Sequence, residues 1–153
     1  MPTIRNVQQP VAGLAGSTPT GPYPAERHDI TSAEPITVLL VEDDFLLRTV
    51  SVSTLADLGY KAYEVPDARQ ALSMLTDNDE INVLITDVNL PGMDGKALAN
   101  EARRIRPGIR VLFVTGYSQK AVKDFELKDG CTGYLSKPYQ HNDLDRALRR
   151  LLM

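Results

Sequence analysis

From residue 36 onward, short apolar runs alternate with longer stretches in which apolar residues recur at helical spacing. Alternation of this kind is typical of a parallel sheet covered by helices. The apolar runs predict five strands, at residues 36–41, 61–65, 82–86, 110–114 and 133–136. The chain is therefore expected to fold as an α/β domain.

The intervening stretches predict five helices, four of which have apolar residues on a shared face. These residues are Leu47, Val50, Leu55 and Leu58; Ala68, Ala71, Leu72 and Leu75; Leu98, Ala102 and Ile105; and Leu144, Ala147, Leu148 and Leu151. Residues 118–128 have fewer apolar anchors and predict the least firmly held helix. Right-handed crossovers then favour a flavodoxin-like, doubly wound five-stranded parallel sheet of order 2-1-3-4-5, flanked by five helices.

Length and composition limit the organisation and the partners of the chain. At 153 residues, the chain has room for one domain with a substantial core. Residues 1–35 contain six prolines and no hydrophobic periodicity, so they predict a disordered N-terminal tail before a domain at 36–153. The net charge of -3 provides no basic field for a phosphate backbone, so no direct nucleic-acid partner is expected.

Cysteine usage and hydropathy favour a cytoplasmic location. Cys131 is the only cysteine, which excludes an internal disulfide and fits a reducing compartment. No apolar run approaches the length of a transmembrane helix, so no membrane association is expected. The segment Val11–Gly16 is too short and too rich in glycine for a signal-peptide core.

Charged residues follow three of the predicted strands. Asp87 ends the third strand, the run Glu42-Asp43-Asp44 follows the first, and Lys137-Pro138 follows the fifth. Strands 1 and 3 are neighbours in the predicted order, so the acids should meet at the edge where open α/β sheets place their chemistry. Carboxylates this close repel one another unless a cation joins them, and oxygen-only ligands favour Mg²⁺. Asp44 and Asp94 have an alternative role as helix caps.

As a set, these motifs resemble the receiver domain of response regulators, the phosphoacceptor module of two-component signalling and phosphorelays. The resemblance covers residues 36–153. It rests on the acidic pair, on Asp87 followed by Leu-Pro-Gly-Met-Asp-Gly at 90–95, on a hydroxyl residue ending strand 4, and on Lys-Pro ending strand 5. It implies that Asp87 is the phosphoacceptor, that Glu42 and Asp43 are the acidic pair, and that the backbone carbonyl of Asn89 completes the protein ligands of Mg²⁺.

The resemblance also implies how phosphorylation occurs and how it is sensed. Lys137 would contact the phosphoryl group, and the Lys-Pro bond is commonly cis in this family. Thr115 would be the switch hydroxyl and Tyr134 a two-state residue, so that the face formed by residues 118–128, 133–136 and the last helix binds a partner. The ring of Tyr117 would shield the acyl phosphate from water.

The resemblance implies a phosphorylation-dependent signalling switch that receives its phosphoryl group from a histidine kinase or phosphotransfer protein. Because the sequence ends directly after the fifth helix, output is expected through a downstream protein target. A receiver excised from a hybrid histidine kinase is the alternative. A phosphohydrolase of the haloacid dehalogenase superfamily is disfavoured, because Asn89 stands where that class has a second aspartate. A flavin carrier is disfavoured because acids follow strand 1 in place of a phosphate loop.

Overall fold

A computed structural model describes residues 3–5, 35–116 and 130–153 of the chain. Its six-stranded sheet has the order β1-β3-β2-β4-β5-β6. The strands are β1 (Thr3–Arg5), β2 (Thr37–Val41), β3 (Lys61–Val65), β4 (Val83–Asp87), β5 (Arg110–Thr115) and β6 (Thr132–Ser136). The five strands from β2 to β6 are parallel to one another, which confirms the five predicted strands. Counted with β2 as the first, they follow the predicted order 2-1-3-4-5.

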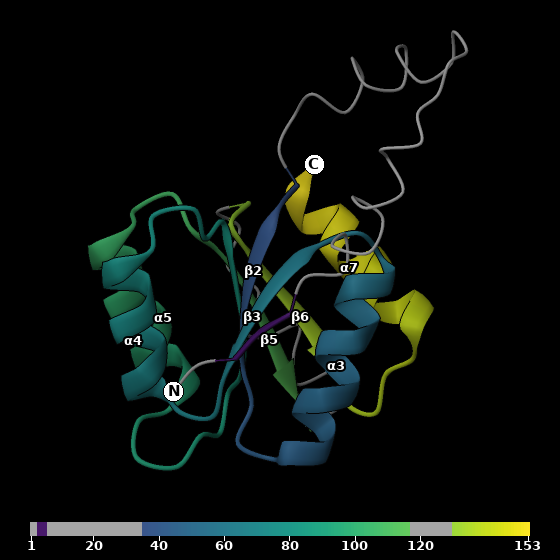
Figure 1. Cartoon of the computed structure of the whole chain (residues 1–153), viewed down its shortest axis with the longest axis horizontal. Coiled ribbons are helices and arrows are strands. Elements are labelled where there is room, and N and C mark those ends of the chain that lie inside the picture. The colour runs from purple at the N-terminus through teal and green to yellow at the C-terminus, as the bar shows by residue number, and fades with distance from the viewer. Residues whose placement is uncertain (1–2, 6–34, 117–129) are drawn as a thin grey trace, which may run out of the picture.

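The helices cover both faces of the sheet (Figure 1). The described helices are α3 (Phe45–Asp57), α4 (Ala68–Asp77), α5 (Gly95–Ile105) and α7 (His141–Leu152). The pair α4 and α5 lies on one face, and α3 and α7 lie on the other. The predicted helix at 118–128 and Tyr117 fall outside the described residues. No helix in the described ranges is both long and apolar enough to cross a membrane.

Strand β1 departs from the predicted disordered tail. Thr3–Arg5 pairs antiparallel with the outer edge of β3, with Ile4 opposite Tyr63. The prediction does not hold at these three residues, because a strand can add to an open sheet edge through backbone hydrogen bonds without an apolar pattern of its own.

Two apolar clusters form the core, one on each face of the sheet. Residues of α4 and α5 pack with inward residues of β2, β4 and β5 on the first face. On the second face, Leu144 and Leu148 of α7 and Val52 and Leu55 of α3 pack against the opposite side of the same strands. Buried strands with apolar residues on both sides are what a parallel sheet covered by two helical layers requires.

Local sequence signals explain where the helices begin. The side chains of Asp44, Asp67 and Asp94 accept hydrogen bonds from backbone N–H groups in the first turns of α3, α4 and α5. These are N-caps, which satisfy amide groups that have no partner within the helix. The capping alternative for Asp44 and Asp94 is therefore confirmed, and Asp67 caps α4 in the same way.

The predicted buried stripe of α3 is wrong in its first half. Leu47 is 45% exposed and Val50 62% exposed, whereas Ser51, Val52 and Leu55 face the core. The periodicity misled because α3 carries apolar residues on several sides, so spacing alone does not identify the side that faces the sheet. Ile105, predicted to point inward, is 38% exposed because it is the last residue of α5 and lies at the rim.

Candidate functional site

Three of the predicted site residues come together at the carboxyl edge of the sheet. Glu42 directly follows β2, Asp87 is the last residue of β4, and Lys137 directly follows β6. The Nζ atom of Lys137 lies 2.7 Å from Oδ2 of Asp87 and 3.2 Å from Oε1 of Glu42. One ammonium group therefore bridges two carboxylates from neighbouring strands.

Asp87 is held by its own backbone surroundings as well as by Lys137. Its Oδ1 atom accepts a hydrogen bond of 2.9 Å from the backbone N–H of Asn89, and its carbonyl accepts one of 3.0 Å from the Thr86 hydroxyl. Gly95, at the start of α5, packs so closely on the Asp87 carbonyl that a Cβ atom there would collide with it. The carboxylate is thus fixed in orientation, and a small part of the side chain, 14%, remains exposed at the edge.

Glu42 is buried and is fixed from three directions. Its Oε2 atom accepts a hydrogen bond of 3.1 Å from the backbone N–H of Asp44, and its own N–H donates to the Val65 carbonyl at 3.1 Å. The guanidinium of Arg48, one turn into α3, donates to the Glu42 carbonyl at 2.7 Å. The loop after β2 is therefore anchored to both β3 and α3.

The charges at this edge shift one another's protonation equilibria. Burial raises the pKa of Glu42 above its ordinary value, against the opposing effects of the Asp44 amide and the Lys137 charge. Burial alone would lower the pKa of Lys137, but its hydrogen bond to Asp87 and the charges of Glu42 and Asp87 together raise it. Lys137 is consequently a firmly protonated cation at neutral pH.

The remaining predicted metal ligands lie next to this ion pair. Asp43 and Asn89 are exposed residues that follow Glu42 and Asp87 in the chain. Within the described part of the chain, no three acidic, histidine or cysteine side chains are grouped so that they could hold a metal ion. In the structure, the positive charge between Glu42 and Asp87 is supplied by Lys137.

The two predicted switch residues occupy adjacent strands. Thr115 is buried at the end of β5, and its carbonyl accepts a 2.7 Å hydrogen bond from the backbone N–H of Lys137. Tyr134 of β6 is half-buried and stacks on Phe113, with ring centroids 5.3 Å apart. Thr115 is thus linked through its backbone to Lys137, and Tyr134 packs against the α4/α5 cluster.

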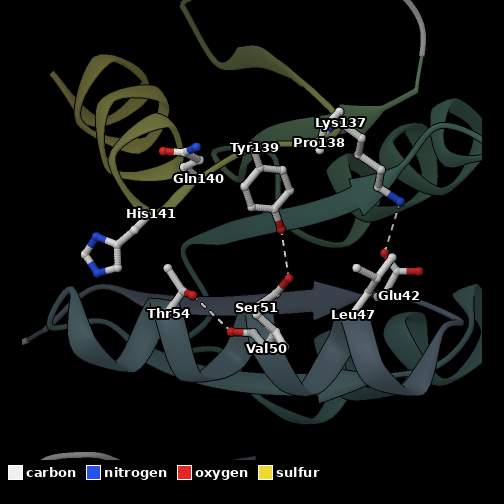
Figure 2. Close-up of a pocket in the computed structure, with 10 residues that line it drawn as sticks. All are labelled: Glu42, Leu47, Val50, Ser51, Thr54, Lys137, Pro138, Tyr139, Gln140 and His141. Carbon is white, nitrogen blue, oxygen red and sulfur yellow. Dashed lines mark hydrogen bonds and ion pairs between the residues drawn. The ribbon is translucent and has the colours of Figure 1, made fainter.

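A pocket of about 460 Å³ opens beside the ion pair, between α3 and the segment that joins β6 to α7. Figure 2 shows its lining, which runs from Glu42 and Lys137 at one end to His141 at the other. The Lys137–Pro138 peptide bond is cis, as the resemblance implies. The hydroxyls of Tyr139 and Ser51 lie 2.8 Å apart across the pocket and form a hydrogen bond.

The exposed start of α3 continues this pocket onto the surface. Phe45 is 64% exposed and Leu46 72%, and Leu47 and Val50 line the pocket itself. Exposed apolar side chains are common one at a time, but a contiguous group beside a polar site is typical of a contact surface. These four residues are called the α3 patch below.

Sequence reasoning missed several features that shape the site. Gly95 was included only as part of the motif at 90–95, and its close packing on the Asp87 carbonyl was not predicted. Glycine is a poor helix former, so its presence in the first turn of a helix is a signal of such close packing. Arg48, Ser51 and Tyr139 gave no comparable signal, since their hydrogen bonds depend on how α3 lies against the loops.

Comparison with protein families gives a match over most of the chain. Residues 38–149 match the family model described as "Response regulator receiver domain". The response regulator receiver protein CpdR of Brucella abortus (strain 2308) is 30% identical over 116 residues, which are 76% of this chain and 96% of that protein. The sensor kinase CckA of the same organism is 33% identical over 117 residues, 76% of this chain and 12% of the kinase.

Other curated relatives are longer than the matched region. The aerobic respiration control protein ArcA of Escherichia coli (strain K12) is 33% identical over 115 residues, which are 75% of this chain. The chain thus spans about half of ArcA, 48% of its length, and a small part of the sensor kinase.

Solved structures show the same architecture. A response regulator receiver protein from Sinorhizobium medicae WSM419 superposes with a TM-score of 0.68 at 28% identity, covering 78% of this chain and 95% of that one. Chemotaxis protein CheY4 of Vibrio cholerae gives 0.69 at 29% identity, covering 77% and 99%.

Proposed function

This chain belongs to the response regulator receiver domain family of two-component signal transduction, and on that premise we propose that Asp87 accepts a phosphoryl group from a histidine kinase or phosphotransfer protein. Members of the family generally act as signalling switches rather than as catalysts of substrate turnover. The observation that carries the proposal is the contact of Lys137 Nζ with both Asp87 and Glu42 at the carboxyl edge of the sheet.

Phosphoryl transfer to Asp87 would form an acyl phosphate. A carboxylate oxygen of Asp87 attacks phosphorus in line, and the bond from phosphorus to the donor's imidazole nitrogen breaks as the new P–O bond forms. The donor nitrogen keeps the electron pair of the broken bond. Because the transition state is loose and its charge lies on the phosphoryl oxygens, the protein contributes mainly position and positive charge. Lys137 is the protein's cation at that place.

Receiver domains typically use Mg²⁺, and the oxygen donors of this chain are chemically suited to that ion. Glu42 and Asp87 direct carboxylate oxygens towards one shared positive charge. Asp43 follows Glu42 in the chain and supplies another carboxylate, although the three are not grouped as a metal site in the described structure. These three residues and the Asn89 carbonyl would hold the ion, with oxygen ligands of the kind Mg²⁺ prefers. When bound, Mg²⁺ would neutralise charge on the phosphoryl oxygens.

Signalling would follow from the added charge on Asp87, about -1.5 to -2 at neutral pH. The Thr115 hydroxyl would donate to a phosphoryl oxygen, and its movement would draw Tyr134 inward from the stack on Phe113. The backbone bond from Lys137 to the Thr115 carbonyl supports this coupling, because it links the cation and the switch residue directly. The downstream protein target would then bind the face that includes β6 and α7.

The protein that donates the phosphoryl group would contact the α3 patch. Any such donor must bring its phosphohistidine to Asp87, and the patch continues into the pocket that Glu42 and Lys137 line. An amphipathic helix beside the donor histidine has the apolar side chains that this surface would bury. Contact there would place the imidazole against the site.

Two biological settings fit this chemistry. One is a single-domain regulator or phosphorelay component, supported by the likeness to CpdR over nearly that protein's whole length. The other is the receiver portion of a hybrid histidine kinase, supported by the likeness to the sensor kinase CckA. Substrate hydrolysis is disfavoured, since Asn89 has no acidic proton to transfer where a phosphohydrolase of this design needs one.

Substitution of Asp87 by Asn tests the assignment. Wild-type protein incubated with acetyl phosphate and Mg²⁺ should gain one phosphoryl group, measured by intact mass. Asp87→Asn should lose this reaction by at least roughly a hundredfold, because the amide is a far weaker nucleophile. Asp77→Asn, at the exposed end of α4, is the matched control and should behave like wild type. Labelling of Asp87→Asn at the wild-type rate would overturn the proposal.

A further inference from the structure

The hydrogen bond between the Tyr139 and Ser51 hydroxyls joins two parts of the site that are distant in sequence. Tyr139 follows the Lys137–Pro138 turn, and Ser51 lies on the buried side of α3. Their oxygens are 2.8 Å apart, and the tyrosine ring reaches across the pocket to the helix (Figure 2). Of the interactions drawn in Figure 2, this hydrogen bond is the one that joins the turn after β6 to the middle of α3.

We propose that Tyr139 and Ser51 are positioning residues for phosphoryl transfer, which act by holding the Lys137 ammonium against Asp87 and Glu42. This inference rests on the proposed function, since it assigns to the two hydroxyls a role in the same reaction. Neither hydroxyl is proposed to touch the phosphoryl group.

The turn that carries Lys137 is anchored on both sides. Before the turn, the backbone N–H of Lys137 donates to the Thr115 carbonyl at 2.7 Å. After it, the Tyr139 ring packs against the cluster formed by α3 and α7. The segment carrying the ammonium is therefore restrained on both sides, and Tyr139 supplies the restraint on the helix side.

Helix α3 is attached both to Glu42 and to the turn that carries Lys137. Ser51 lies one turn after Arg48, whose guanidinium donates to the carbonyl of Glu42 at 2.7 Å. The same helix thus fixes one carboxylate partner of Lys137 through Arg48 and the lysine's own turn through Ser51. Because α-helices are stiff over such a distance, the two attachments define the separation between Glu42 and the Lys137 turn.

Loss of the hydrogen bond between Tyr139 and Ser51 would leave a partly buried hydroxyl without its partner. A half-buried tyrosine hydroxyl needs a partner, and the Ser51 hydroxyl provides it. Burial raises the pKa of Tyr139, with opposing effects from the Ser51 hydrogen bond and from the charge of Lys137. Because Tyr139 lies two residues after Lys137, in the segment that carries the ammonium, loss of its hydroxyl should displace Lys137 more than it weakens the fold as a whole.

The test uses three single substitutions in the full chain. Tyr139→Phe and Ser51→Ala each remove one hydroxyl of the pair. Tyr60→Phe is the matched control, because Tyr60 also packs partly buried on the α3/α7 cluster but precedes β3 at the other end of the sheet. Each protein is assayed for its initial rate of phosphorylation by acetyl phosphate with Mg²⁺, and its folding is checked by urea unfolding.

A second readout follows Lys137 without any phosphorylation. The ¹³C shift of the Lys137 ε-methylene group, assigned by its loss in Lys137→Ala, reports the surroundings of the ammonium. In Tyr139→Phe and Ser51→Ala we expect the ¹³C signal of Lys137 to move. We also expect the initial rate of phosphorylation to fall roughly three- to tenfold, which is the change in rate that corresponds to the net free energy of one hydrogen bond. Tyr60→Phe should keep both values.

The outcomes separate this inference from the proposed function. A wild-type rate in Tyr139→Phe, or a lower rate with an unmoved Lys137 signal, would overturn the positioning role. An equal effect in Tyr60→Phe would overturn it too, since the cause would then be general loss of packing. If wild type itself gained no phosphoryl group, the proposed function would fail, while the Lys137 signal would still report whether the hydroxyls hold the ammonium.

Discussion

Helices α3 and α5 are built alike but meet their surroundings differently. Each begins at an aspartate N-cap, Asp44 or Asp94, and each lies against the parallel sheet, on opposite faces (Figure 1). On α5, the exposed large apolar residue is Ile105 at the very end, whereas α3 exposes all four residues of the α3 patch in its first two turns.

The difference separates structural from functional surface. The apolar residues of α5 are accounted for by covering the sheet, because Leu98, Ala99 and Ala102 are buried in the α4/α5 cluster. In α3, Val52 and Leu55 cover the sheet in the same way, whereas the residues of the α3 patch, which precede them, do not. That patch borders the pocket beside Lys137. An apolar surface next to the proposed phosphoacceptor is therefore best explained by a partner protein that binds there.

The largest expected effect concerns stability and compares the same substitution in the two helices. Leu98→Ala removes a side chain with no exposed surface and should destabilise the domain by about 2–5 kcal/mol through lost burial and a residual cavity. Leu47→Ala should cost less than about 1 kcal/mol, because half of that side chain already faces water. Urea unfolding of both variants measures the difference.

Equal destabilisation by the two variants would break the comparison. It would mean that Leu47 is covered in solution by some part of the chain, and that the α3 patch is not a free surface. Leu55→Ala, within α3 but fully buried, sharpens the test, since it should resemble Leu98→Ala despite its position in the same helix as Leu47.

Much of the fold and the centre of the site could be predicted from the sequence because they follow from simple periodicities. Carboxyl ends of neighbouring parallel strands meet at one edge. Residues that end apolar runs on neighbouring strands, such as Glu42 and Asp87, are therefore placed at the same edge by topology alone. Both contact the ammonium of Lys137, which follows β6, the strand beyond β5.

Other features depend on tertiary geometry that local patterns do not encode. The face that α3 turns to the sheet was mispredicted because Leu47 and Val50 are as apolar as Val52. Strand β1 pairs through backbone groups, which every residue except proline carries. The bond between Ser51 and Tyr139 spans 88 positions and needs both side chains to face the same pocket.

The second largest expected effect is on the rate of phosphoryl transfer from a histidine kinase to this protein. The double substitution Leu47→Gln and Val50→Gln removes apolar surface from the α3 patch without adding charge near Asp87. Transfer from a phosphorylated histidine kinase should fall about tenfold, since the loss of two partly buried contacts weakens the encounter complex. Phosphorylation by acetyl phosphate should be unchanged, because that small donor needs no docking surface.

Ile105→Gln on α5 is the control for this experiment, since it removes an exposed apolar side chain from the opposite face. It should leave both reactions as in wild type. A similar loss from Ile105→Gln, or a loss with acetyl phosphate in the α3 double variant, would show that the patch acts by some means other than docking.

The smallest expected effect is a pH-dependent gain in stability from Glu42→Gln at the border of the pocket. Burial raises the pKa of Glu42 above 4.5, so ionising this carboxyl costs folding free energy even with Lys137 nearby. This free-energy cost is absent at pH values below the pKa that Glu42 has in the unfolded chain. It is fully present at pH values above the raised pKa that Glu42 has in the folded protein. Wild type should therefore lose stability relative to Glu42→Gln as pH rises from about 4 towards neutrality, measured as urea midpoints across that range. A difference that stays constant with pH, or that favours wild type increasingly towards neutrality, would mean that Lys137 stabilises the ionised carboxylate by more than its burial costs.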